Sequence, residues 1–239
     1  MKSNGFTDRE FWKSYWEKYE FEKVPSKVPF QKFLSKLRNK DSFIEIGGFP
    51  GIFSAYFYSK GYKKVSLLDF YIDEAIVRKC EKINSLPENT IHCIEADFFT
   101  YSTKDQYDLV FSFGFIEHFQ DTKDVLQRHV SMLANQGRLL IILPNFKGLN
   151  GLVQYLFDKE NLKAHNLDCM KPALLKSIAL ALNLKNITVE YSRKPMVWLE
   201  PNVSSIWVRK FIKLCSYALK LFPIKCRILS PYIILYAEK

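Results

Sequence analysis

Short apolar runs alternate with segments of helical length and period through most of the chain. Such an alternation is typical of βαβ units, in which parallel strands are joined by right-handed crossovers. The pattern therefore predicts a parallel sheet wrapped by helices on both faces. The strands it predicts are residues 42–47, 64–70, 90–97, 107–114 and 137–144.

The alternation of strands and helices changes after Pro144, where a loop and helices are expected over residues 146–183. A strand at 186–192, a basic helix at 203–222 and a last strand from Ser230 to Lys239 follow. A late strand that returns after its predecessor indicates an antiparallel hairpin at one end of the sheet. The predicted fold class is α/β: a doubly wound, mostly parallel seven-stranded sheet with a C-terminal antiparallel hairpin.

The first forty residues have a helical pattern. Residues 7–10 have the spacing of a capping box, and Trp12, Tyr15, Trp16 and Tyr19 then follow on one face. We expect this aromatic face and the loop around 145–165 to form a lid over a substrate. Plain packing of the same face in the core is the alternative.

The first predicted strand runs into FIEIGGFPG, residues 43–51, which is rich in glycine. Ligands of such sheets bind at the carboxyl ends of the strands, where a glycine loop lets backbone approach them. A dinucleotide fingerprint, G-x-G-x-x-G, would have Ile46 in place of its first glycine. The alternative pattern is E-x-G-x-G-x-G. Glu45, Gly47 and Gly51 match it, with Phe49 at its middle glycine and Gly48 one place early.

Acidic and aromatic residues stand at the ends of the next strands. Asp69 ends the second strand about twenty residues after the loop, where a carboxylate can accept hydrogen bonds from both ribose hydroxyls of an adenosine. This placement fits NAD and S-adenosylmethionine (SAM) alike. Phe70 can pack on an adenine face. Asp97 can receive the adenine amino group, and Phe98 can cover the ring.

The fourth strand ends in Ser112, Phe113 and Gly114. Together, the four strand ends resemble class I SAM-dependent methyltransferases, in the branch that includes quinone-ring, small-molecule and bacterial glycan O-methyltransferases. The resemblance covers residues 40 to about 192. It implies a Rossmann-like fold, SAM as cofactor and S-adenosylhomocysteine (SAH) as product. The cofactor contacts it implies are Glu45, Gly47, Gly48, Gly51, Asp69, Phe70, Asp97, Phe98, Ser112, Phe113 and Gly114.

The resemblance also implies a division of the chain. Residues 1–40 would form a helical lid and residues 41–239 the SAM methyltransferase domain. Within that domain, 145–183 and 193–227 would be insertions on the substrate side.

Two histidines are candidates for a base that takes the proton from an acceptor hydroxyl. His118 follows Glu117 just beyond the fourth strand, in a segment that resembles the family's L-E-H-V. His165 opens a stretch that resembles the family's helix lead-in beside the acceptor. We favour His165, with a capping or surface role as its alternative. Quinone-ring relatives bind a metal through E-x-x-E-H, but Gly114 replaces the first carboxylate, so no metal site is expected.

The composition bears on the cellular location and on the binding partners of the protein. Five cysteines without a C-x-x-C pair fit reduced thiols in a cytoplasmic protein, and neither a signal peptide nor a spanning segment is expected. The formal net charge is +10, and residues 203–227 carry many cations and no acid. This segment could lie peripherally on an anionic membrane or bind a phosphorylated acceptor. Alternatively, it packs its apolar face on the sheet edge with its lysines in water. Nucleic acid is not expected as a partner, because no RNA-binding module accompanies the charge.

The function expected from these features is methyl transfer from SAM to a hydroxyl of a small molecule or of a glycan- or lipid-linked intermediate. One competitor is an NAD(P)-dependent oxidoreductase, against which the missing first glycine counts. The other is a non-catalytic SAM-fold module docked on a membrane, in which Phe49 blocks the methionine end.

Overall fold

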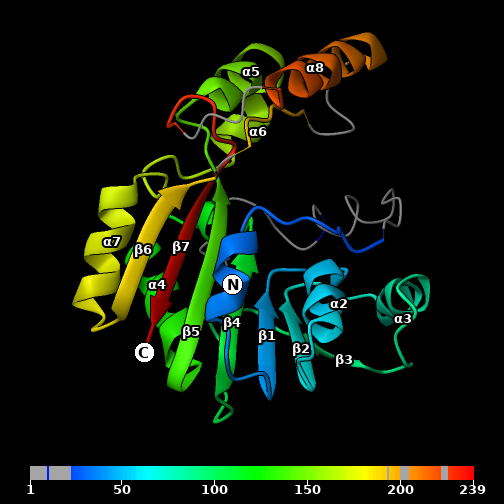
Figure 1. Ribbon diagram of the computed structural model, residues 1–239, viewed down its shortest axis with the longest axis vertical. Helices are drawn as coiled ribbons and strands as arrows, with labels where there is room; N and C mark the ends of the chain where they lie inside the picture. Colours follow the sequence, from blue (N-terminus) through cyan, green and yellow to red (C-terminus); the bar gives the residue numbers. More distant parts are fainter. Residues whose placement is uncertain (1–9, 11–22, 193, 200–204, 222–225) are drawn as a thin grey trace.

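The computed structural model describes residues 10, 23–192, 194–199, 205–221 and 226–239. Its centre is a seven-stranded sheet in the order β3-β2-β1-β4-β5-β7-β6 (Figure 1). Strands β1 to β5 are parallel, and β7 runs antiparallel to both of its neighbours. The predicted fold class is thereby confirmed. The strands are β1 (Ser42–Ile46), β2 (Lys64–Asp69), β3 (Ile91–Glu95), β4 (Tyr107–Phe113), β5 (Leu133–Pro144), β6 (Lys185–Tyr191) and β7 (Tyr232–Glu238).

Helices cover both faces of the sheet, because the central strands are apolar on both sides. In β5, Leu139 and Ile141 belong to the core on the side of α4 (Thr122–Ser131) and α7 (Pro172–Ala181). The intervening Leu140 belongs to the opposite core, with α2 (Ile52–Ser59) and α3 (Glu74–Ile83). Successive side chains of a strand point to opposite faces, so one strand serves both layers.

The N-terminal segment is only partly described. The short 3-10 helix η1 (Gln31–Lys36) packs on the α2 side of the sheet, with Phe30 and Phe33 fully buried. Glu10 is helical, but the rest of the predicted capping box and the aromatic stripe lie outside the described residues. The lid over residues 1–40 stays a prediction, while Val28, Phe30, Phe33 and Leu37 belong to the core.

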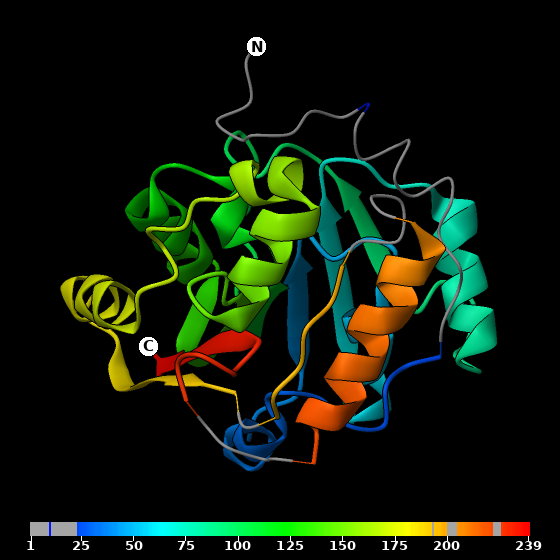
Figure 2. The same ribbon diagram turned by 90° about the horizontal axis from the view of Figure 1, so that it is seen from above.

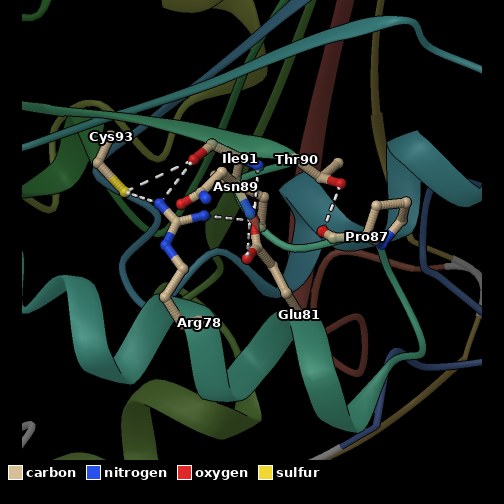
Figure 3. A network of polar contacts seen from close by, with 7 residues as sticks. All are labelled: Arg78, Glu81, Pro87, Asn89, Thr90, Ile91 and Cys93. Atoms are coloured by element: carbon tan, nitrogen blue, oxygen red, sulfur yellow. Dashed lines mark hydrogen bonds and ion pairs between the residues drawn. The ribbon is translucent and has the colours of Figure 1, made fainter.

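Polar contacts tie α3 to the start of β3 (Figure 3). The buried Glu81 carboxylate accepts hydrogen bonds from the Ile91 amide at 2.7 Å and the Asn89 amide at 3.1 Å. Arg78 pairs with it at 2.6 Å and donates to the Ile91 carbonyl at 3.0 Å. This network holds β3 in register, and thus places the strand end that leads to Asp97.

Three helices stand above the carboxyl ends of the strands: α5 (Leu149–Phe157), α6 (Lys159–Lys163) and α8 (Ile206–Leu219). Figures 1 and 2 show α5 and α8 over this end of the sheet. They share a small apolar seam that includes Val153, Val197 and Ile212. Among the described helices, none is long and apolar enough to cross a membrane.

Candidate functional site

The glycine loop follows β1 and has a backbone that requires glycine at two positions. Gly47 and Gly51 have φ angles of +66° and +93°, in the left-handed region that side chains disfavour. The Gly47 amide donates to the Leu68 carbonyl at 2.8 Å, and the Gly51 amide to the Gly48 carbonyl at 2.7 Å. The loop therefore turns tightly from β1 into α2 while remaining attached to β2.

Nearby residues also leave no room for a side chain at Gly47 or Gly48. A Cβ on Gly48 would lie 2.1 Å from the carboxyl carbon of Glu45, and one on Gly47 would lie 2.0 Å from the ring of Phe115. The sequence suggested only a ligand as the reason for the glycines. The structure adds that two side chains of the protein itself occupy the space.

Glu45 stabilises this loop through hydrogen bonds to Ser54. Its buried carboxylate accepts hydrogen bonds from the Ser54 amide at 2.7 Å and the Ser54 hydroxyl at 2.6 Å. Burial raises the pKa of Glu45 to about 8. The residue thus links the end of β1 to the first turn of α2, and a direct contact with a cofactor stays a prediction.

Asp69 lies at the neighbouring strand end and is half-buried. Its carboxylate accepts from the Phe49 amide at 3.0 Å and the Tyr71 amide at 3.3 Å. Burial raises the pKa of Asp69 to about 6, and these backbone bonds oppose the rise. Phe70, next to it, is also half-buried. Asp69 thereby joins the glycine loop to β2 at the position expected for ribose.

Phe49, the departure from the glycine pattern, points into the core. Its ring is 2% exposed and meets Tyr71 edge to face, with 5.7 Å between the ring centroids. The aromatic side chain is therefore accommodated in the apolar layer on the α2 side.

The loop after β3 contains a half-buried acid, Asp97, and a buried aromatic ring, Phe98. Asp97 is half-buried and accepts a hydrogen bond from the Phe99 amide at 2.8 Å. Phe98 is 5% exposed, and its ring lies against Phe115 and His129, with centroid distances of 5.2 and 5.1 Å. In this structure the Phe98 ring is a core side chain, and its predicted role as an adenine cover stays a prediction.

At the end of β4, side chains alternate between the two faces. Ser112 is fully buried, and its hydroxyl contacts Nε2 of His129 at 3.2 Å, while Nδ1 of that histidine donates to the Val125 carbonyl. His129 is thus structural. Phe113 instead stacks on Phe53 on the other face, with centroids 5.0 Å apart. Gly114 turns the chain with a φ angle of +69°.

The two candidate bases, far apart in the sequence, lie side by side. The ring centroids of His118, at the end of the 3-10 helix η2 (Ile116–His118), and His165, just after α6, are 4.7 Å apart. Asn166 holds them together: its amide donates to the Glu117 carbonyl at 2.6 Å, and its side chain donates to the Phe119 carbonyl at 2.8 Å.

Burial disfavours the charged form of both histidines. Burial lowers the pKa of His118 to about 3 and also lowers the pKa of His165. A carbonyl can only accept, so His165 Nδ1 carries the proton that bonds the Asn161 carbonyl at 2.5 Å. This leaves Nε2 of His165 as the basic nitrogen.

Glu117 completes a compact polar group with the two histidines. Its side chain is buried, burial raises its pKa to about 8, and its Oε2 has no hydrogen-bond partner among the described residues. One possible ligand atom from each of Glu117, His118 and His165 lies within 4.8 Å of the others. This group could hold a metal ion, since two imidazoles and a carboxylate form common transition-metal sites. The expectation of no metal rested on residues 114–118 alone and did not include His165.

Aromatic rings continue from the histidines toward the ends of β4 and β7. His165 meets Phe146 at 5.0 Å, Phe146 meets Trp198 at 5.9 Å and Trp198 stacks on Tyr232 at 5.4 Å, measured between ring centroids. Tyr232 in turn meets Phe113 at 5.1 Å. Sequence reasoning did not assign Trp198 or Tyr232 to the site, because neither lies in a recognisable motif.

Solved structures of similar shape are SAM-dependent methyltransferases. One from Archaeoglobus fulgidus is 18% identical, with a TM-score of 0.57, over 88% of this chain and 91% of its own. Haemonchus contortus phosphoethanolamine N-methyltransferase 2, bound to SAM, is 15% identical with a TM-score of 0.60, over 87% of this chain and 51% of its own. The plantazolicin methyltransferase BpumL, bound to SAH, is 13% identical with a TM-score of 0.55, over 97% of this chain and 90% of its own.

A search of curated proteins found no match. A family model described as a methyltransferase domain matches residues 9–189. This range includes the glycine loop, all four strand ends and both candidate bases. The match spans more than half of the chain, so the protein belongs to the methyltransferase domain family, as a SAM-dependent methyltransferase with a Rossmann-like fold.

Proposed function

We propose that the protein transfers the methyl group of SAM to a hydroxyl oxygen, with His165 as the general base. The observation that carries this proposal is a half-buried His165 whose Nδ1 donates to the Asn161 carbonyl and whose pKa is lowered by burial. The hydroxyl oxygen forms a bond to the methyl carbon while the carbon–sulfur bond breaks. The hydroxyl proton passes to His165 Nε2, and SAH leaves with the sulfur electron pair. A base placed in this way contributes about 10²- to 10⁴-fold to the rate.

In this proposal the strand-end residues bind the cofactor. Asp69 would accept hydrogen bonds from the ribose, with Phe70 on the adenine face and Asp97 at the adenine amino group. The backbone of Gly47, Gly48 and Gly51 would approach the methionine end, and Glu45 would keep that loop in place through Ser54. SAM supplies the activated methyl group, so the protein must mainly align it with the acceptor and exclude water.

The acceptor in this proposal is a small molecule or a glycan- or lipid-linked intermediate. The aromatic row from His165 to Phe113 offers apolar faces for the body of such a molecule. Peripheral contact of residues 203–227 with a membrane stays a separate prediction from the sequence. The exposed cations of α8 support it.

A methylation assay tests the role of His165. SAH release is measured over a panel of hydroxylated acceptors for the wild type, for His165→Ala and for His92→Ala, which replaces an exposed histidine on β3. We expect His165→Ala to be slower by about 10²-fold with unchanged SAH affinity, and His92→Ala to match the wild type. In the wild type the rate should rise with pH, because the neutral imidazole is the base. The midpoint should lie below the ordinary histidine pKa and should be missing in His165→Ala. Equal rates for wild type and His165→Ala would overturn the proposal.

Metal-assisted transfer is the second candidate, favoured by the buried Oε2 of Glu117. A cation held by Glu117, His118 and His165 would lower the pKa of a bound hydroxyl and take over the task of the base. Dialysis against a chelator separates the two candidates. Unchanged turnover after dialysis supports His165 as the base, and a loss that a divalent cation restores supports the metal.

A further inference from the structure

Exposed apolar side chains are concentrated on one part of the molecule. Apart from Leu180 on α7, every exposed large hydrophobic side chain in the described part of the chain lies on α5, on α8, just after α8 at Leu221, or beside the start of α5 at Ile228. Trp207, Leu214, Leu221 and Ile228 are 75%, 66%, 77% and 64% exposed. Ile228 is distant from α5 in the sequence but lies beside its first residue, because the Ile228 carbonyl accepts a hydrogen bond from the Leu149 amide at 2.7 Å. Exposed apolar side chains that are concentrated on two neighbouring helices mark an interaction site.

Helix α8 has more apolar residues than its packing in the protein needs. One stripe, which includes Val208, Ile212 and Cys215, faces the seam shared with α5. A second stripe, Trp207, Phe211 and Leu214, has the same helical spacing and remains exposed. The first stripe holds the helix on the protein, so the second is available to a partner.

Cations border the exposed stripe. Between Ser205 and Leu221 there are four basic residues and no acid. The Lys210 ammonium is 5.3 Å from the Trp207 ring centroid, and the Lys220 ammonium is 4.8 Å from that of Tyr217. The Tyr155 ring of α5 forms a similar pair with Lys159, the first residue of α6, whose ammonium lies 4.7 Å from the ring centroid. Aromatic rings beside lysines, next to a row of leucine and phenylalanine, are typical of helices that lie in the interface of an anionic bilayer.

We propose that α5, α8 and Ile228 form a surface that docks on a membrane containing anionic phospholipids. The apolar side chains would enter the boundary between headgroups and acyl chains, and the lysines would contact lipid phosphates. Both helices contribute aromatic rings that lie beside lysines, which favours a lipid surface over a binding groove for a single peptide. The sequence alone placed such a contact on residues 203–227, and the structure adds α5 as its second half.

The surface is connected to the candidate site. The buried Gln154 of α5 donates to the Trp198 carbonyl at 2.9 Å and accepts from the side chain of Asn161 at 3.0 Å. Asn161 is the residue whose carbonyl holds His165. Both helices stand above the carboxyl ends of the strands (Figure 2). If the proposed function holds, the acceptor class is an amphiphile whose hydroxyl group reaches His165 from the bilayer. The docking itself does not depend on that.

Vesicle co-sedimentation tests the docking without any activity measurement. The full chain is mixed with vesicles of phosphatidylcholine alone or of phosphatidylcholine with phosphatidylglycerol. We expect at least about tenfold stronger binding to the anionic vesicles, and this gain should weaken as salt is added. No sedimentation with either vesicle would overturn the proposal.

Matched variants locate the surface. The triple variant Trp207→Ser, Phe211→Ser and Leu214→Ser should lose vesicle binding, whereas Leu180→Ser, the exposed leucine outside the surface, should keep it. Changing Lys210, Lys213 and Lys220 to Gln should remove the preference for anionic lipid. The same change at the exposed Lys64, Lys82 and Lys104 should not. Unchanged circular dichroism and SAH affinity show that each variant is folded.

Equal losses in the control variants would overturn the proposal. So would a dimer by light scattering that becomes a monomer in the Trp207 triple variant without any vesicle binding. In that case, a second copy of the chain covers the surface. Failure of the methylation assay alone would leave the vesicle result standing, so the two proposals fail separately.

Discussion

Glu45 and Asp69 both end parallel strands, yet their surroundings give them different tasks. Glu45 is 1% exposed and bonded to Ser54, whereas Asp69 is half-buried beside the loop backbone. The first acid therefore shapes the loop, and the second is the one positioned for a ligand. A sequence pattern identifies both as strand-end acids and cannot separate them, because burial depends on Gly48, Ser54 and Phe49 together.

The sequence did not predict the contact between His118 and His165, which lie far apart in the chain. Local patterns identified His118 and His165 separately. Their contact depends on Asn166, which bonds the segment after β4 through its side chain and backbone. The one local signal was the spacing from Asn161 to His165, four residues, which allows a side chain to reach a carbonyl one turn back.

Glu117 gives a prediction on pH and stability. Its folded-state pKa of about 8 lies above the ordinary 4.5 because of burial. The folded state therefore binds the proton more tightly, and the stability that Glu117 contributes is lost as pH rises from about 4.5 to 8, by at most about 1.4 kcal/mol per pH unit. Glu117→Gln lacks this loss.

The free energy of unfolding is measured with urea across this pH range for the wild type and Glu117→Gln, in the presence of chelator. The variant should gain stability relative to the wild type as pH rises. The nearby His118 titrates in both proteins, so its contribution cancels in the difference. Parallel curves for the two proteins would contradict a buried Glu117 carboxyl that is hard to ionise in the folded state.

Among the elements, the strands were predictable and the connections were less so. Each predicted strand is present, because alternating and continuous apolar runs report directly on burial in a sheet. Strand β5 begins at Leu133, earlier than the predicted residue 137, because Leu133 pairs with Tyr107 before the register shifts. The polar residues after Leu133 hid this start. For α8, the sequence left open packing on the sheet edge, and the structure instead packs it against α5.

The contact between α3 and β3 provides a test at the scale of elements. Glu81→Ala should destabilise the protein by about 3 kcal/mol, because Arg78 and the Ile91 amide lose their buried partner. Glu74→Ala, an exposed acid on the same helix, should change the unfolding free energy by less than about 0.5 kcal/mol. Urea unfolding measures both. If Glu81→Ala were as mild as Glu74→Ala, the network in Figure 3 would not hold β3 on α3.

At the scale of the molecule, the sheet order brings together segments that the sequence separates. Strands β1 and β4 are neighbours at the centre, so the glycine loop and the loop with His118 meet at one edge. The sequence predicted only that ligands bind at the carboxyl ends of the strands, and the strand order shows which of these ends meet. The methyltransferase interpretation is confirmed over the oxidoreductase. The sequence analysis expected residues 145–183 and 193–227 on the substrate side, but no local pattern specified that α5 and α8 pack against each other.

The central claim is that the strand ends of β1 and β2 hold the cofactor, and calorimetric titration with SAH tests it most directly. The titration compares the wild type, Asp69→Ala and the exposed control Asp105→Ala, at a pH well above the Asp69 pKa of about 6. Hydrogen bonds to a charged acceptor are worth about 1.5–3 kcal/mol each. The account therefore predicts at least about tenfold weaker binding for Asp69→Ala, with wild-type affinity for Asp105→Ala. A folded Asp69→Ala that binds SAH as tightly as the wild type would contradict it.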